Sequence, residues 1–333
     1  MIATTGLLLA GLAWGVGEDR AEEMRRPEVV WTGKAEGERA GPARAVAFST
    51  DGKLLAAAIG KEFAIWEAGD GSRRRTIREP GTELVGSVAF SPDGAVLATG
   101  RAKPLDETGR LWRASDGGLL RQYKADRLHV TTVAFDPRGD LLATSGYGNG
   151  IRLWHWADGS PLRVVGDDVQ VRFALAFSPD GRRLAAAAVR PHSVRVWGVD
   201  DGRPLLTLEG HTDFVNDVAF SPDGLTLASC SSDGTAQLHR ARDGSLLRTL
   251  GDRSPPRDRS RSVNSLAFSP DGLTLWAAGV SSSSGLLRAW RVADGTLLLR
   301  DASGPPIHDV AVSPSGHLIA TARDDGTVVV ARD

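Results

Sequence analysis

Cysteine is almost absent from this chain, which has Cys230 alone among 333 residues. A single thiol excludes a disulfide within the chain and a zinc site built from several thiolates. Cys230 ends the apolar, strand-like run Leu227-Ala228-Ser229-Cys230. We therefore interpret it as a small buried side chain rather than a nucleophile.

An excess of charge of either sign is also missing. The chain has 40 basic and 41 acidic residues, which gives a formal net charge of -1. Binding to duplex nucleic acid requires a basic face that neutralises many phosphates, and this composition supplies no overall excess. We therefore expect a protein or peptide partner and no nucleic acid.

The motifs of the common enzyme families are absent. The sequence has no Gly-x-Ser-x-Gly elbow, no phosphate-binding loop ending in Gly-Lys-Ser/Thr, and no Gly-x-Gly-x-x-Gly after a strand. Its seven histidines lack the spacing of a metal-binding helical pair. We predict no enzyme and assign no catalytic, cofactor-binding or metal-binding residue. His192 and His308 fall near loops, so a ligand site assembled across distant segments stays open.

The first residues of the chain are apolar over residues 2–16, which is too short to span a bilayer comfortably as a helix. Leu7-Leu8-Leu9-Ala10 resembles the centre of a secretory signal, although no Lys or Arg precedes it. We interpret residues 1–22 as a signal-like or disordered leader. A signal favours export or envelope association over the cytoplasm, and an uncleaved one would anchor the protein to a membrane.

Internal repetition is what the chain has in abundance. The segment Val88-Ala89-Phe90-Ser91-Pro92-Asp93-Gly94 recurs seven times, with its aromatic position at residues 48, 90, 135, 177, 220, 268 and, as Val, 312. In each copy an apolar run ends in a turn with Gly, which accepts a positive φ; six copies also have Pro, which fixes φ, and the first has Thr50 there. The repeat length of 42 to 48 residues accounts for nearly the whole chain.

Each repeat predicts four short antiparallel strands. A second β run follows the turn, a third ends at a Trp position, and a fourth begins after an Asp-Gly turn four residues past that position. One such sheet cannot bury both of its faces, but seven stacked around an axis can, and closing the ring removes exposed edges. We predict an all-β, seven-bladed propeller over residues 27–333.

The two ends of the chain predict how the ring closes. The last repeat stops within residues 327–333, at a third strand with no fourth after it. Glu28-Val29-Val30-Trp31-Thr32, just before the first repeat, has the character of the missing strand. We therefore expect the N-terminal strand to complete the last blade.

The chain resembles the WD-repeat propellers. The repeat that matches the family's motif most completely runs from Gly210-His211 to Asp233-Gly234-Thr235. In that family the His, a Ser or Thr of the second strand, the turn Asp and the third-strand Trp form a structural hydrogen-bonded tetrad. The resemblance implies structural roles for His211 and Asp233, with Ser229 or Ser231, although His239 occupies the Trp position. The positions that keep the Trp, none followed by the family's Asp, are Trp66, Trp112, Trp154, Trp197 and Trp290.

The resemblance also implies a non-catalytic, monomeric scaffold that holds a protein or peptide on one loop face. The Arg- and Ala-rich, Lys-poor composition suggests the bacterial type of this family. Two loops expected on that face are enlarged, at residues 101–109 and 251–261, and guanidinium groups bind carboxylates and phosphates well. The candidate partner-binding residues are Arg101, Lys103, Arg253, Arg257, Arg259 and Arg261. A propeller hydrolase, or a small-ligand-binding protein with its site at the central channel, is the alternative.

Overall fold

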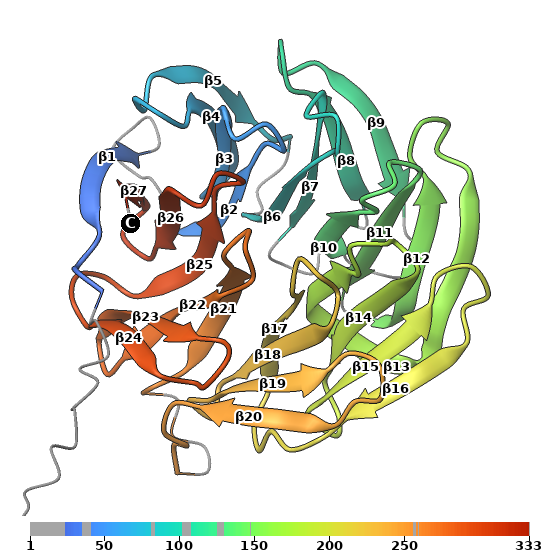
Figure 1. The fold of residues 1–333 in the computed structure, drawn as a ribbon. Coiled ribbons are helices and arrows are strands. Elements are labelled where there is room, and N and C mark those ends of the chain that lie inside the picture. The colour runs from blue at the N-terminus through green and yellow to red at the C-terminus, as the bar shows by residue number, and fades with distance from the viewer. Residues whose placement is uncertain are drawn as a thin grey trace, which may run out of the picture.

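The computed structural model describes residues 24–34, 41–80, 84–101, 108–124, 130–146, 148–255, 258 and 260–332. The expected leader, residues 1–22, lies outside this part of the chain. Every regular element in the described part is a β-strand, and the strands form six antiparallel sheets (Figure 1). This confirms the all-β prediction.

Five of the sheets have four strands, as each repeat predicts. They are β2 (Ala43–Phe48), β3 (Leu54–Ile59), β4 (Glu62–Glu67) and β5 (Arg73–Arg78); β6 (Val85–Phe90), β7 (Val96–Arg101), β8 (Thr108–Arg113) and β9 (Leu119–Lys124); β17 (Val215–Phe220), β18 (Thr226–Ser231), β19 (Ala236–Arg240) and β20 (Leu246–Leu250); β21 (Val263–Phe268), β22 (Thr274–Ser281), β23 (Ser284–Arg291) and β24 (Leu297–Asp301); and β1 (Glu28–Lys34) with β27 (Thr327–Arg332), β26 (Leu318–Arg323) and β25 (Ile307–Val312).

The sixth sheet has seven strands because one strand serves two repeats. Its strands are β10 (Val130–Phe135), β11 (Leu141–Gly146), β12 (Gly148–His155), β13 (Pro161–Phe177), β14 (Arg183–Ala188), β15 (Ser193–Gly198) and β16 (Pro204–Leu208). The first part of β13 pairs with β12, and its last part pairs with β14. Six sheets therefore carry seven repeats, and the blade count of seven stays a prediction.

The turn after the first strand of a repeat is built by its own side chains. In the fifth repeat, the hydroxyl of Ser221 donates a hydrogen bond to Asp223 (2.5 Å) and accepts one from the backbone N–H of Thr226 (2.9 Å). Gly224 has φ 70°, which a residue with a Cβ rarely adopts. The Ser-Pro-Asp-Gly sequence thus fixes where the second strand begins.

The ring closes through the N-terminal strand. β1 pairs in antiparallel register with β27, from Glu28 opposite Arg332 to Lys34 opposite Thr327. The indole N–H of Trp31 donates a hydrogen bond to the carbonyl of Ala68 (2.9 Å), so β1 also contacts the first repeat. The prediction that the N-terminal strand completes the last sheet is confirmed.

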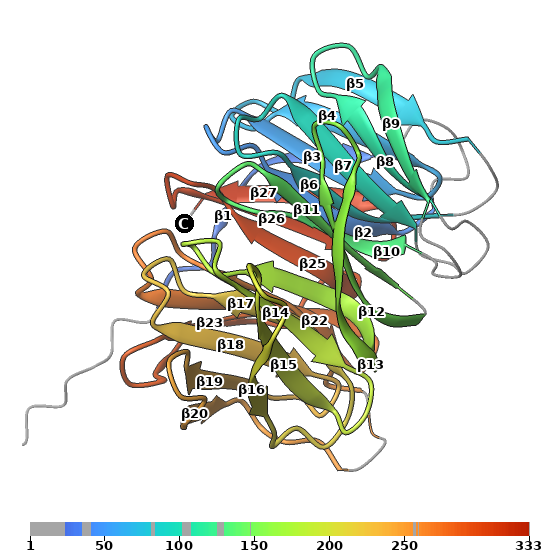
Figure 2. The same ribbon diagram turned by 90° about the vertical axis from the view of Figure 1, so that its right-hand side faces the viewer.

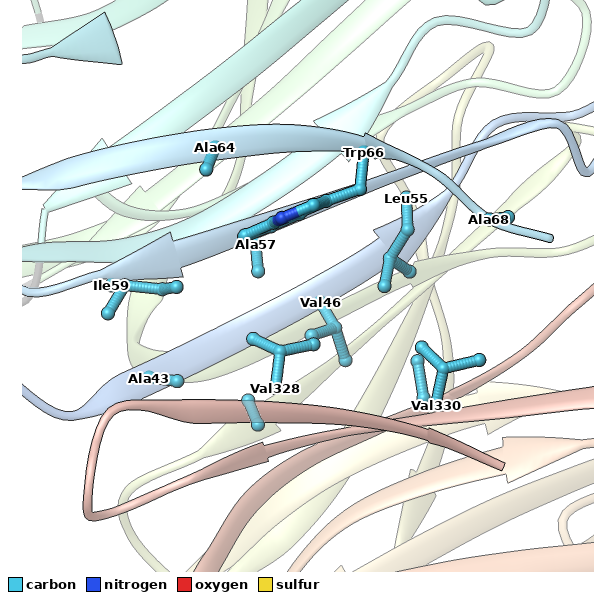
Figure 3. Close-up of a cluster of buried hydrophobic side chains, with 12 residues drawn as sticks. Ala43, Val46, Leu55, Ala57, Ile59, Ala64, Trp66, Ala68, Val328 and Val330 are labelled. Carbon is cyan, nitrogen blue, oxygen red and sulfur yellow. The ribbon is translucent and has the colours of Figure 1, made fainter. Parts of the chain in front are cut away.

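A hydrophobic seam joins the first and last sheets next to this strand. Its fully buried side chains from β2 to β4 include Leu55, Ile59 and Trp66, and β27 contributes Val328 and Val330. Figure 3 shows both valines on the side of the seam that faces the first sheet. The same construction recurs around the ring, where seven hydrophobic clusters among the described residues each combine side chains of two successive repeats.

The closure predicts how truncation from the N-terminus acts. Removing residues 1–22 should leave the thermal midpoint unchanged within about 2 °C, because no described contact is lost. Removing residues 1–32 deletes most of β1 and exposes the edge of β27, so the midpoint should fall by about 10 °C or more. Differential scanning calorimetry of the two truncated proteins checks this, and equal midpoints would refute the closure.

Candidate functional site

Each repeat has an irregularity at the same place, near the start of its first strand. The register of pairing with the second strand shifts by one residue or more there in all seven repeats, as between Val215 and Asp217 or between Ile307 and Asp309. A bulge of this kind leaves a residue without a ladder partner and redirects its side chain. The sheets therefore turn a set of side chains toward the centre of the ring.

These side chains line a central cavity of about 430 Å³. We call the set the inner ring; it comprises Arg44, Ala45, Gly86, Ser87, Thr131, Thr132, Ala174, Leu175, Asn216, Asp217, Asn264, Ser265, His308 and Asp309. Figure 1 views the molecule along this centre, with β2, β6, β10, β17, β21 and β25 innermost. The cavity opens on the face where the first strands begin.

Part of the inner ring fastens neighbouring repeats to one another at four places. The described bonds of this kind run from the backbone N–H of Val133 to Ser87 (3.3 Å), of Leu266 to Asp217 (2.9 Å), of Val310 to Ser265 (3.3 Å) and of Val46 to Asp309 (2.8 Å). The last of these joins residues at opposite ends of the chain. Carboxylates and hydroxyls at the bulge thus satisfy backbone donors of the neighbouring sheet.

Asp217 and Asp309 are the two acidic members of the inner ring. Removal from bulk water raises the pKa of Asp217 to about 7, and the charge of Asp309 adds to the shift. Burial also raises the pKa of Asp309, against the hydrogen bond that the hydroxyl of Ser265 donates to it (2.6 Å). Two such carboxylates from different sheets are what a ligand-binding channel would require.

In the fifth repeat, hydrogen bonds join three of the four tetrad positions that the resemblance implies, and His239 at the Trp position shares none of them among the described residues. The ring nitrogens of His211 lie 3.1 Å from Asp233 and 3.0 Å from the hydroxyl of Ser229. Burial opposes ionisation of Asp233, but hydrogen bonds from His211 and Thr235 outweigh it and hold the pKa of that carboxyl well below its usual range. At the Trp position, burial and the charge of His211 lower the pKa of His239 to about 4, so His239 is neutral at pH 7.

A different network occupies the corresponding place in the second repeat. The indole N–H of Trp112 donates to Thr99 (3.0 Å), whose hydroxyl donates to the buried carboxylate of Glu79. Two buried guanidinium groups, those of Arg101 and Arg110, pair with Glu79 at 3.3 and 3.2 Å. Arg101 is only 2% exposed and is held in this buried ion pair. The surface role in partner binding that we predicted for it therefore does not fit its position.

The other predicted positions are exposed, lie outside the described residues, or are buried tryptophans. Arg253 and Arg261 are exposed on the segment that leads to β21, and Arg253 donates to the carbonyl of Gly210 (3.0 Å). Lys103, Arg257 and Arg259 lie outside the described residues. The five tryptophans implied to be structural are all buried, namely Trp66, Trp112, Trp154, Trp197 and Trp290.

Sequence reasoning missed the inner ring, although a signal was present. Polar side chains stand three and four residues before the repeated aromatic in several repeats, as Asn216 and Asp217 do before Phe220. A strand with one face buried would alternate there, so two adjacent polar residues indicate a bulge.

Neither a membrane-spanning helix nor a metal-binding cluster is present among the described residues. No helix in that part of the chain has the length and hydropathy needed to cross a membrane. Nor does the same part bring together three or more His, Cys, Asp or Glu side chains in a group that could hold a metal ion.

Comparison with known proteins gives a consistent family. The sequence model described as "WD domain, G-beta repeat" matches residues 71–113, 117–155, 202–240, 245–291 and 295–330, together more than half of the chain. The chain is 31% identical over 135 residues to the human telomerase Cajal body protein 1, 33% over 150 residues to the transcriptional corepressor LEUNIG_HOMOLOG of Arabidopsis thaliana, and 32% over 145 residues to the bovine transducin beta-like protein 3.

Each match covers only part of this chain and only part of the relative. They cover 37%, 44% and 40% of this chain, and 24%, 18% and 16% of the respective relatives, so the chain spans a quarter or less of each of them. All three relatives come from eukaryotes. The bacterial type inferred from composition therefore receives no support from them.

The raised pKa of Asp217 predicts a pH-dependent stability. A carboxyl whose folded-state pKa lies above its ordinary 3.8 stabilises the fold below pH 3.8, and that contribution is lost as pH rises through about 7. The free energy of unfolding should fall between pH 4 and pH 7 by up to about 4 kcal/mol, at about 1.4 kcal/mol per pKa unit. In Asp217→Asn this fall should be smaller and limited to the part that the raised pKa of Asp309 contributes.

Urea unfolding of wild type and Asp217→Asn at several pH values measures the difference. The matched control is Asp243→Asn, because Asp243 is an exposed turn carboxyl whose pKa is lowered to about 2, mainly by hydrogen bonds from Ser245, and so titrates below this window. Parallel profiles for wild type and Asp217→Asn would contradict the prediction.

The tetrad predicts unequal effects for two His–Asp pairs. The side chains of His211 and Asp233 are 3% and 1% exposed, so His211→Ala leaves a buried carboxylate without one partner and should cost about 2–4 kcal/mol. His308 pairs with Asp324 at 2.9 Å, but that carboxylate is 56% exposed, and His308→Ala should cost about 1 kcal/mol or less. Equal losses in chemical denaturation would argue against a structural tetrad.

Proposed function

The chain belongs to the WD domain, G-beta repeat family, and on that premise we propose that it is a non-catalytic scaffold that binds a protein or peptide over the inner ring. Its relatives include a transcriptional corepressor and a telomerase Cajal body protein, whose names place them in assemblies. The observation that carries the proposal is the central cavity, to which the first strand of every repeat contributes.

The cavity has the size and rigidity of a recognition site. About 430 Å³ lies within the range of pockets that enclose small ligands, and accommodates one or two side chains of a partner. Its walls are held by hydrogen bonds between neighbouring sheets, so little conformational entropy is lost on binding. A peptide that inserts a side chain here meets a preformed surface.

The polar side chains of the inner ring favour a partner that inserts a polar side chain into the cavity. Arg44 lines the cavity, and its Nε is buried with no hydrogen-bond partner among the described residues. A carboxylate of a partner in the cavity would pair with this half-buried guanidinium group through its exposed part. Arg253 and Arg261, exposed beside β21, would add attraction for acidic residues that flank the inserted side chain. We propose that the protein does this as a monomer.

A hydrolase or small-ligand-binding protein with its site in the channel is the second candidate, and Asp217 and Asp309 favour it. Both carboxylates, however, accept hydrogen bonds from backbone N–H groups of their own and the neighbouring sheet. These oxygen atoms therefore serve to hold neighbouring sheets together before they can serve a ligand. Stoichiometric metal in the purified protein, measured by mass spectrometry, would shift the balance toward this second candidate.

The scaffold proposal predicts that reversing one charge in the cavity abolishes capture of a partner. Tagged wild type and Arg44→Glu would be used to recover interacting proteins from the source cell, with quantification by mass spectrometry. A specific partner should fall by about tenfold with Arg44→Glu, as expected for losing one buried polar anchor. The matched control is Arg78→Glu, the same change on the outer strand β5 of the same sheet, where the side chain is exposed.

Two results would count against the proposal. If Arg44→Glu recovers the same partner as wild type in equal amount, the inner ring is not the binding surface. If Arg78→Glu loses the partner as well, the effect follows from net charge rather than from the cavity.

A further inference from the structure

Four arginines gather on the face of the ring away from the mouth of the central cavity. They stand where the first strands end: Arg182 and Arg183 follow the turn after β13, while Arg240 and Arg242 lie at the end of β19. With the turn after β17 they line a groove of about 610 Å³. Figures 1 and 2 both show β17–β20 beside β13–β16, the two groups of strands that the groove separates.

One of the arginines forms the fixed wall of this groove. The guanidinium of Arg183 donates to the carbonyls of Ala241 (2.5 Å) and Gly224 (3.3 Å), and it lies 5.5 Å from the ring centre of Phe220. These contacts reach from one repeat into the next and hold the positive charge in place. A fixed guanidinium costs a ligand little entropy to engage.

The remaining arginines extend the positive charge outward. Arg240 shares its guanidinium with Asp243 (3.4 Å) and Ser245 (2.9 Å). Arg182 and Arg242 are exposed, and their side chains make no hydrogen bond or ion pair within the described residues. The groove lining holds a single acidic residue, Asp180, whose carboxylate accepts from Ser178 and from the backbone of its own turn.

The repeats show that this charge is not part of the fold. Across the seven repeats, the first residue of the second strand is Leu, Val or Thr, except in the fourth repeat, where it is Arg183. Arg242 likewise stands where the first four and the sixth repeat have Gly, Ser, Ala or Asp. Strands of the same kind form with other side chains at these positions, so the gathering of these arginines is particular to two adjacent repeats.

Apolar side chains border the same groove. Leu225 and Leu247 both line it, and they are 67% and 44% exposed. Leucine that remains in water beside a charged groove marks a surface that can be covered by a partner. The ligand therefore has both acidic groups and an apolar side chain.

We propose that this groove is a second docking site, which binds an acidic peptide segment that carries an apolar side chain. Carboxylates of the peptide pair with Arg182, Arg242 and the fixed Arg183, because guanidinium and carboxylate match in geometry as well as charge. The apolar side chain covers Leu225 and Leu247. A nucleic acid fits less well, since the basic surface is confined to two repeats and a phosphate backbone gives the leucines nothing to contact.

The test is direct binding of a defined peptide. A fluorescein-labelled peptide Asp-Glu-Glu-Leu-Glu-Glu-Asp is titrated with the full chain, and fluorescence anisotropy is followed at about 50 and about 300 mM NaCl, since salt screens exposed charge pairs. Wild type should bind saturably and more weakly at the higher salt. The double variant Arg182→Glu/Arg242→Glu should weaken binding by about tenfold or more, and a peptide with Ser for Leu by about threefold.

Matched controls separate the groove from general charge and from the inner ring. Arg113→Glu changes an arginine that, like Arg240, follows the third-strand Trp position, but in β8 outside the groove, and it should leave the affinity unchanged. Arg44→Glu should also leave it unchanged, so the docking site and the scaffold proposal can fail separately. The far-UV circular dichroism spectrum and thermal midpoint of the double variant should equal those of wild type, which shows that the variant is folded.

Three outcomes overturn the proposal. The first is an absence of saturable binding to wild type. The second is an affinity of the double variant within about twofold of wild type, which removes the arginines from binding. The third is an oligothymidylate of equal charge that displaces the peptide at equal concentration, which assigns the groove to nucleic acid instead.

Discussion

The contact on which the rest of the structure depends is the seam between the first and last sheets. Every sheet of the ring buries its faces only if both neighbours are present, and at this seam the neighbours come from opposite ends of the chain. Three contacts close this seam. At the outer radius β1 pairs with β27, at the middle radius Trp66 is buried with Val328, and at the inner radius the backbone N–H of Val46 donates to Asp309. Because the entropy of closing a loop grows only slowly with its length, such a distant contact need not exceed the others in strength.

The inner ring links this closure to the proposed function. A bulge in the first strand leaves a neighbouring backbone N–H to be satisfied, and Asp217, Ser265 and Asp309 satisfy such groups from the adjacent sheet. The same bulge turns side chains such as Arg44 and Asn264 into the central cavity. The fold and the proposed recognition would therefore share one device, and Arg44, whose Nε has no hydrogen-bond partner among the described residues, is the side chain proposed to meet a partner.

Turn chemistry and periodicity predicted most of the fold, because both are local. The Ser-Pro-Asp-Gly turns and the unpaired last strand were enough to place the strands and the closing role of Glu28–Lys34. The merging of two repeats into one sheet was not predictable, since β13 continues as one strand past Gly166, where its pairing with β12 shifts register, and pairs with β14 only from Val171 onward. The surface role predicted for Arg101 was wrong for a similar reason. Its partner Glu79 lies between β5 and β6, and no rule of sequence spacing connects it with the end of β7.

A repeat protein contains its own reference for what the fold requires. Where the copies agree, as in the buried or partly buried aromatic or aliphatic residue before each turn, packing explains the choice; where a copy departs, packing does not. His239 and Ala331 in place of Trp, and Arg183 in place of Leu, Val or Thr, are such departures. His239 is buried and neutral, and no hydrogen bond joins it to His211 among the described residues, whereas the half-buried Arg183 holds a charge beside three more arginines. Departure from the repeat is therefore the sequence signal that points to the groove proposed as a docking site in this chain.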